Sequence, residues 1–164
     1  MSMAAVRLPP DLLEMITRGV SAIVGSRDAA LRPSIMRAVG TQVAPDGGAV
    51  TVYLSRAQSR QLLQDIASTG HIAVVFSEPA THRAVQLKAR RAEMRAATEA
   101  DRPVLQGYLA SMEHEVERVG YTRAMARAML AHRLEDVVAV RFTPEQAFVQ
   151  TPGPKAGTPL GGGQ

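Results

Sequence analysis

The sequence contains no cysteine and no tryptophan among its 164 residues. Without cysteine, the chain has no disulfide bond, no thiolate zinc site, no iron–sulfur cluster and no cysteine nucleophile. Aromatic residues make up only 4% of the chain, so the stacking platforms of a nucleic-acid-binding protein are scarce. The basic residues are dispersed and do not gather in a stripe, and we therefore expect no nucleic-acid partner.

Long hydrophobic runs are also missing. No stretch approaches the roughly 20 apolar residues that a transmembrane helix needs. Residues 1–11 lack the basic start and apolar run of a secretory signal, so we expect a cytoplasmic protein that does not bind a membrane. The histidines at positions 71, 82, 114 and 132 do not have the spacing of a His-x-x-x-His motif, and no metal site is expected.

Arginine is abundant. The formal net charge is +4, from 19 basic and 15 acidic residues, and the only lysines are Lys88 and Lys155. Arginine suits bidentate contacts to phosphate or carboxylate groups better than lysine does. The same usage is also typical of genomes whose composition favours arginine and alanine, so charge alone does not identify a ligand.

Hydrophobic periodicity predicts an α+β domain over residues 1–150, with a loose Pro/Gly-rich tail over 151–164. Strands are expected at 20–26, 34–43, 49–54, 71–76, 82–94, 137–143 and 146–150. Helices are expected from Pro9 to a stop at Gly19, at 55–68, and as a helical pair at 98–133, where Glu115 falls on a solvated face.

Turn signals join some of these strands. Residues 45–48 read Pro-Asp-Gly-Gly, which predicts a hairpin between the second and third strands. The last two strands flank Pro144 and are expected to form a second hairpin. Many short strands joined by hairpins favour an antiparallel barrel with helices at its edges over a parallel doubly wound sheet.

The segment 50–63 is the most informative for chemistry. A strand is expected to run into a helix whose first turn carries Ser55, Arg56, Ser59 and Arg60. Free backbone amides, a positive dipole end, hydroxyl groups and guanidinium groups together can bind an anion such as phosphate. Alternatively, Ser55 and Gln58 form a capping box and the arginines are solvated. Arg37, on the second strand, is either solvent-exposed or recruited to the same anion.

Five features in order resemble one known family. They are the strand with Arg37, the Pro-Asp-Gly-Gly turn, the strand ending at Tyr53-Leu54, the Ser59-Arg60-Gln61 helix start, and the strand His82-Arg83-Ala84-Val85-Gln86-Leu87-Lys88-Ala89. Their combination is similar to the pyridoxamine 5′-phosphate oxidase-like FMN-binding split β-barrel superfamily. The agreement runs from about Asp11 to Met94, and the last two strands also fit. Each motif is short, so the inference depends on their combination.

The resemblance implies a split antiparallel β-barrel of about six to seven strands with flanking helices. It also implies a homodimer with FMN in a cleft between the subunits. The implied phosphate contacts are Arg37, Ser59 and Arg60, with Gln61 in place of the family's lysine. The implied ring contacts are the backbone around Ala38, Val39, Tyr53 and Leu54, together with the side chain of Gln86.

The chain departs from the true oxidase in three ways. It lacks that enzyme's tryptophan and Arg-x-His signature, so the oxidase substrate is not carried over. The helical pair at 98–133 is extra, and could cover the cleft, widen the dimer interface or serve only packing. We expect an FMN-dependent oxidoreductase with a small-molecule substrate or electron donor. The alternative is a non-catalytic binder or sensor of flavin, haem or a deazaflavin. No residue stands out as an acid or base.

Overall fold

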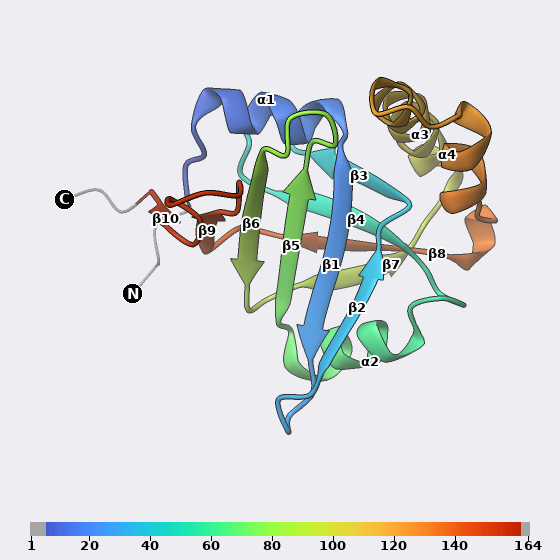
Figure 1. Ribbon diagram of the computed structural model, residues 1–164. Helices are drawn as coiled ribbons and strands as arrows, with labels where there is room; N and C mark the ends of the chain where they lie inside the picture. Colours follow the sequence, from blue (N-terminus) through green and yellow to red (C-terminus); the bar gives the residue numbers. More distant parts are fainter. Residues whose placement is uncertain (1–5, 162–164) are drawn as a thin grey trace.

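The computed structural model describes residues 6–161, which form two antiparallel sheets with helices around them (Figure 1). The strands are β1 (Ser21–Arg27), β2 (Pro33–Arg37), β3 (Gly40–Val43), β4 (Val50–Ser55), β5 (Ile72–Ser77), β6 (Ala84–Ala89), β7 (Glu93–Ala96), β8 (Val137–Phe142), β9 (Gln146–Val149) and β10 (Pro159–Leu160). The α-helices are α1 (Pro10–Arg18), α2 (Arg60–Thr69), α3 (Arg102–Arg118) and α4 (Arg123–Met129), with 3-10 turns at Glu99–Asp101 and Leu134–Asp136.

The two sheets enclose one apolar core. The six-stranded sheet has the order β10-β9-β6-β5-β1-β2, and the four-stranded sheet has the order β3-β4-β8-β7. Alternate residues of each sheet point inward, among them Val24, Phe76 and Leu87 from the first and Val52 and Val140 from the second, and all five are fully buried. The expected α+β split antiparallel barrel is confirmed.

Two predicted strands are each divided between the sheets. The predicted strand 34–43 becomes β2 and β3, because the amide of Ala38 donates to Ala22 O in β1 (3.0 Å) while the amide of Val39 donates to Tyr53 O in β4 (2.8 Å). The predicted strand 82–94 becomes β6 and β7 in the same way. These divisions and β10 explain why the described residues hold ten strands and not six to seven.

The second predicted hairpin is wrong. β8 pairs with β4 and β7, whereas β9 pairs with β6 and β10, so the chain changes sheets at the buried Pro144. The tail is not loose over its described part, because Pro159 and Leu160 pair with Phe148 and Ala147. Residues 162–164 lie outside the described residues.

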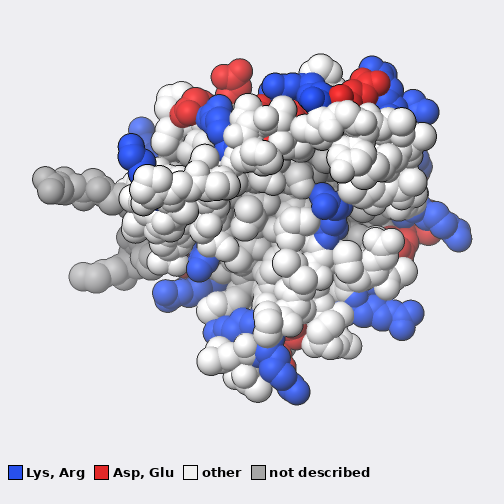
Figure 2. All heavy atoms as spheres, in the orientation of Figure 1, with Lys and Arg blue, Asp and Glu red and all other residues white. Residues whose placement is uncertain are grey.

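The helices leave one sheet surface uncovered. α2 packs against β1 and β2, and α3 packs against β3. Strands β6, β5, β1 and β2 face the viewer in Figure 1 with no helix in front of them. Figure 2 shows that this surface, which we call the outer face, is largely uncharged with isolated basic groups. Within residues 6–161, no helix is both long and apolar enough to span a bilayer.

The predicted helical pair is present as α3 and α4, and it has a small core of its own that includes Met112, Val116 and Leu130. α3 is also fastened to the barrel where α1 meets β1. Tyr108 Oη donates to Val20 O at 2.8 Å, and Ser111 Oγ donates to Gly19 O at 2.6 Å. The pair is therefore firmly attached to the barrel beside β1.

Candidate functional site

The helix that carries the predicted anion site begins at Arg60, with Ser59 as its N-cap, and not at Ser55. Ser55 is the last residue of β4, and its hydroxyl donates to Asp136 Oδ2 at 2.7 Å. The amide of Ala57 donates to the same carboxylate at 3.2 Å. These contacts hold the loop in a turn before the helix starts. The prediction of a capping box formed by Ser55 and Gln58 is therefore wrong.

Ser59 is the most unusual polar residue of this region. Its side chain is buried, with only 2% of the residue exposed, and its Oγ has no hydrogen-bond partner among the described residues. It makes no side-chain cap to α2, and the first turn of α2 carries no acidic residue. A helix N-terminus of this kind attracts an anion, and a buried hydroxyl without a partner is costly. Both features fit a phosphate oxygen as the missing partner.

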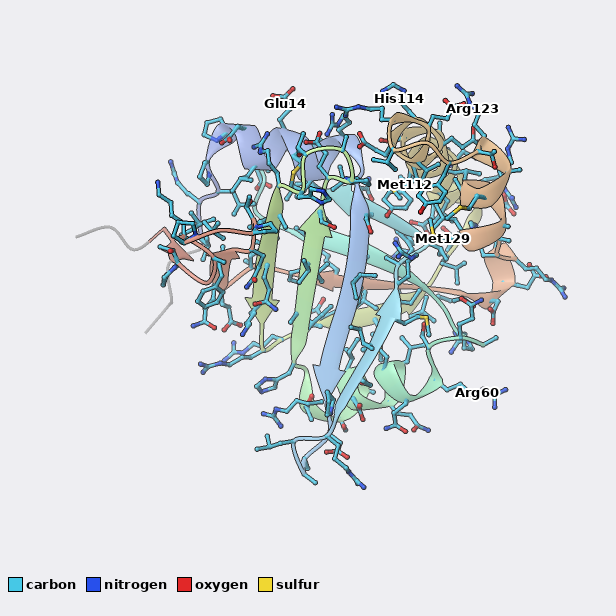
Figure 3. The ribbon with its side chains drawn as sticks, in the orientation of Figure 1. Glu14, Arg60, Met112, His114, Arg123 and Met129 are labelled. Atoms are coloured by element: carbon cyan, nitrogen blue, oxygen red, sulfur yellow. The ribbon has the colours of Figure 1, made fainter. Side chains whose placement is uncertain are left out.

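The other predicted phosphate contacts do not converge on Ser59 in this structure. Arg60 is exposed, and its side chain extends away from the barrel (Figure 3). Gln61 donates to Asp65 Oδ1 at 2.8 Å, so its amide is already engaged within the helix. Arg37 ends β2, but its side chain lies on the face of the sheet opposite to the one that meets α2, where it donates to Ser21 Oγ at 2.8 Å. Convergence of these groups on one anion stays a prediction.

The four residues predicted to line a flavin ring lie next to one another. The backbones of Val39 and Tyr53 are joined by a hydrogen bond, and Ala38 and Leu54 flank them. All four residues are buried, main chain included, so the structure exposes none of them to a ligand on a single subunit. Burial raises the pKa of the Tyr53 hydroxyl, which donates to Asp101 Oδ1 at 2.9 Å.

Asp101 is a buried residue that the sequence reasoning missed. Arg95 holds its carboxylate with two hydrogen bonds of 2.7 Å, and the Thr98 amide donates to it at 2.8 Å. The hydrogen bonds from the Arg95 guanidinium hold the pKa of Asp101 well below its usual range. The Thr98-x-x-Asp101 spacing, a capping box, was the available signal. This cluster ties the start of α3 to Tyr53 and has a structural role.

Glu115 was expected on a solvated face but is completely buried. Its carboxylate lies 3.6 Å from Arg18 Nη2 and 3.6 Å from Arg118 Nη1, without a hydrogen bond to either. The same two arginines flank the buried Glu78, whose pKa is lowered first by a hydrogen bond from Thr81 and then by Arg18. This ion cluster links α1, the β5–β6 turn and α3.

Gln86, the last predicted site residue, lies on the outer face. The register places Arg37, Ile23, Val75, Gln86 and Phe148 side by side in one row across β2, β1, β5, β6 and β9. With strands about 4.8 Å apart, Arg37 and Gln86 are about 14 Å from each other. The amide of Gln150 donates to Gln86 Oε1 at 3.4 Å. Two predicted contacts therefore share one open surface.

No family model matches the sequence, and no curated protein matches it. Solved structures that are similar in fold include the following three. An F420 reductase has a TM-score of 0.56 at 14% identity, over 85% of this chain and 98% of its own. HutZ, the heme storage protein from Vibrio cholerae, has a TM-score of 0.52 at 18% identity, over 87% of this chain and 94% of its own.

The third is a pyridoxamine 5′-phosphate oxidase-related FMN-binding protein from Nostoc punctiforme, with a TM-score of 0.50 at 9% identity, over 85% of this chain and 83% of its own. Identities this low establish a shared fold and not a shared ligand. The chain has the split-barrel fold of the pyridoxamine 5′-phosphate oxidase-like proteins.

Proposed function

We propose that the protein binds FMN and acts as an FMN-dependent oxidoreductase on a small molecule. The observation that carries this proposal is the buried, unpartnered hydroxyl of Ser59 at an N-terminus without an acidic residue. When bound, FMN supplies hydride or electron transfer.

Each phosphate contact has a distinct part in this proposal. Ser59 donates its hydroxyl, and the α2 N-terminus adds free amides and the positive end of the helix dipole. Arg60 is exposed, so its guanidinium can turn toward the phosphate at little cost. Arg37 exchanges Ser21 for a phosphate oxygen. Gln61 adds no charge and stays with Asp65, so we expect weaker binding than in a relative with lysine there.

The outer face supports a homodimer with the cofactor at the subunit interface. Its central residues Ile23 and Val75 are apolar and only partly buried, and Ile35 is 67% exposed. A contiguous apolar surface of this kind is unusual on a monomer. A second copy would cover it and bring Gln86 to the flavin ring. Sedimentation velocity on the purified protein tests this, because a monomer would contradict it.

The cofactor is tested by titrating the protein into FMN and following the quenching of flavin fluorescence. We expect binding, and Arg37→Gln to weaken it about 10- to 150-fold, which is the loss of one hydrogen bond to a charged group. Arg141→Gln, which changes an exposed arginine on β8, is the control and should bind normally.

Two parallel measurements separate the alternatives. Oxidation of a reduced nicotinamide by the FMN-loaded protein would support an enzyme, whereas stable binding without turnover would favour a carrier or sensor. Titration with hemin and with F420 covers the ligands of the similar structures. Binding of either one, without binding of FMN, would overturn the proposal.

A further inference from the structure

Helix α3 contacts two backbone segments that adjoin Arg37. The first is the start of β3, three residues after Arg37, where a Cβ at Gly40 would lie only 2.6 Å from Leu105 Cδ2. The second is the loop that leads from α1 into β1, where a Cβ at Gly19 would lie 3.2 Å from Tyr108 Cδ2. β1 is the strand paired with β2, which Arg37 ends. The two glycines therefore let α3 approach the backbone closely at both segments.

The Tyr108 hydroxyl holds the residues next to Ser21. Tyr108 is 3% exposed, and its Oη donates to Val20 O at 2.8 Å. Burial raises the pKa of this hydroxyl, whereas the Arg37 charge and the Ala22 amide act in the opposite direction, so both groups lie close to the Tyr108 oxygen. Arg37 Nη1 in turn donates to Ser21 Oγ at 2.8 Å. The hydroxyl therefore fixes the backbone on either side of the serine that holds Arg37.

A second hydroxyl of α3 provides a comparison within the same loop. Ser111 Oγ donates to Gly19 O at 2.6 Å, two residues before Ser21. Tyr108 and Ser111 thus attach α3 to successive carbonyls, but of the two it is Tyr108 that contacts a direct neighbour of Ser21. Loss of either hydroxyl removes one hydrogen bond between α3 and the loop, whereas loss of the Tyr108 hydroxyl also frees the backbone beside the partner of Arg37.

We propose that Tyr108 is a positioning residue of the anion site, and that through Val20 and Ser21 it holds the Arg37 guanidinium in one place before a ligand binds. This inference rests on the proposed function, in which Arg37 contacts a phosphate, and it gives the helical pair a part in binding. A long side chain that is already ordered loses less conformational freedom when an anion binds. If this order had to be created on binding, affinity would fall about 2- to 12-fold.

The first test needs no ligand. NMR relaxation of the Arg37 Nε–H group is measured in the purified full chain, and the signal is assigned by its loss in Arg37→Gln. We expect an ordered Arg37 side chain in the natural protein and a mobile one in Tyr108→Phe, seen as a lower heteronuclear NOE. In Ser111→Ala, the matched control, Arg37 should stay ordered. An Arg37 signal that Tyr108→Phe leaves unchanged, or an equal loss of order in both variants, would overturn the proposal.

A second variant keeps the test valid if Tyr108→Phe fails to fold. Ser21→Ala removes the acceptor of the Arg37 hydrogen bond at a partly buried position and leaves both hydrogen bonds of α3 to the loop in place. Arg37 should become mobile in this variant as well. An Arg37 side chain that stays ordered would show that Ser21 does not hold it, and this result would also overturn the proposal.

A double-variant cycle with FMN separates this inference from the proposed function. Tyr108→Phe alone should weaken FMN binding about 2- to 12-fold. In the Arg37→Gln background the same substitution should have no further effect, because Tyr108 acts through Arg37. Equal weakening in both backgrounds would assign Tyr108 a general structural role and overturn the inference, while FMN binding itself would stand. If the natural protein does not bind FMN, the proposed function fails, and the NMR result alone decides whether Tyr108 positions Arg37.

Discussion

Replacing Ser59 by alanine should have opposite effects on stability and on ligand binding. A serine N-cap usually stabilises its helix by about 0.5–2 kcal/mol, but this serine makes no cap hydrogen bond. Its buried hydroxyl lacks a partner among residues 6–161, and an unsatisfied buried polar group costs about 1–3 kcal/mol. Ser59→Ala should therefore stabilise the unliganded protein by about 1 kcal/mol, which corresponds to a Tm rise of about 2–4 °C.

The same substitution should weaken the binding of FMN. If the hydroxyl donates to a phosphate oxygen, its loss removes about 1.5–3 kcal/mol of binding free energy, or about 10- to 150-fold in Kd. Higher stability together with weaker binding is the result expected when a residue contributes to ligand binding but lowers the stability of the unliganded protein.

The assays are thermal unfolding without ligand and fluorescence titration with FMN. Ser111→Ala is a matched control, because its hydroxyl has a partner at 2.6 Å. Ser111→Ala should lower stability by about 1 kcal/mol and leave FMN affinity unchanged. A Ser59→Ala protein that is less stable and binds FMN normally would identify Ser59 as an ordinary helix cap and refute the reasoning.

Two further predictions concern the scaffold. Asp101→Asn should lower the free energy of unfolding by about 1.5–3 kcal/mol at neutral pH, because the hydrogen bonds from Arg95 lose their charged acceptor. The pKa of Asp101 is lowered in the folded state. The carboxylate therefore stabilises the fold fully when the pH is above the ordinary pKa of about 3.9, and this stabilisation is lost as the pH falls below that value. Urea unfolding at a series of pH values should show this loss in the natural protein and not in Asp101→Asn. Gly70→Ala should cost more than about 2 kcal/mol in urea unfolding, because φ is 72° and a Cβ would lie 2.5 Å from Arg90 O. An unchanged midpoint would contradict that contact.

Local sequence signals predicted the helices and strands better than they predicted which strands pair with each other. The turn at 45–48 and the alternation in 49–54 identified the β3–β4 hairpin, and Gly70 correctly marked the end of α2. The predicted strand 82–94 was too long: the alternation of Val85, Leu87 and Ala89 stops at Arg91, the amide of Ala92 donates to Gly70 O, and the next strand joins the other sheet. Such long-range contacts leave no local pattern.

The candidate site was predictable only in part. Composition and spacing located the hydroxyl and guanidinium groups at the start of α2 and the end of β2. They could not show that Ser59 lacks a hydrogen-bond partner among the described residues. The loop before Ser59 is held by Asp136, which accepts hydrogen bonds from Ser55 and Ala57 and lies 77 positions after Ser59 in the chain.

The junction at Ala38 and Val39 has a consequence for how the molecule responds to force. The amides of these two adjacent residues donate to strands of different sheets, so the backbone here connects the six-stranded sheet directly to the four-stranded sheet. Arg37 is the residue just before it. A force applied through a ligand bound to the Arg37 side chain would act on both sheets at the same time. We therefore expect the barrel to unfold in one step and not one strand after another.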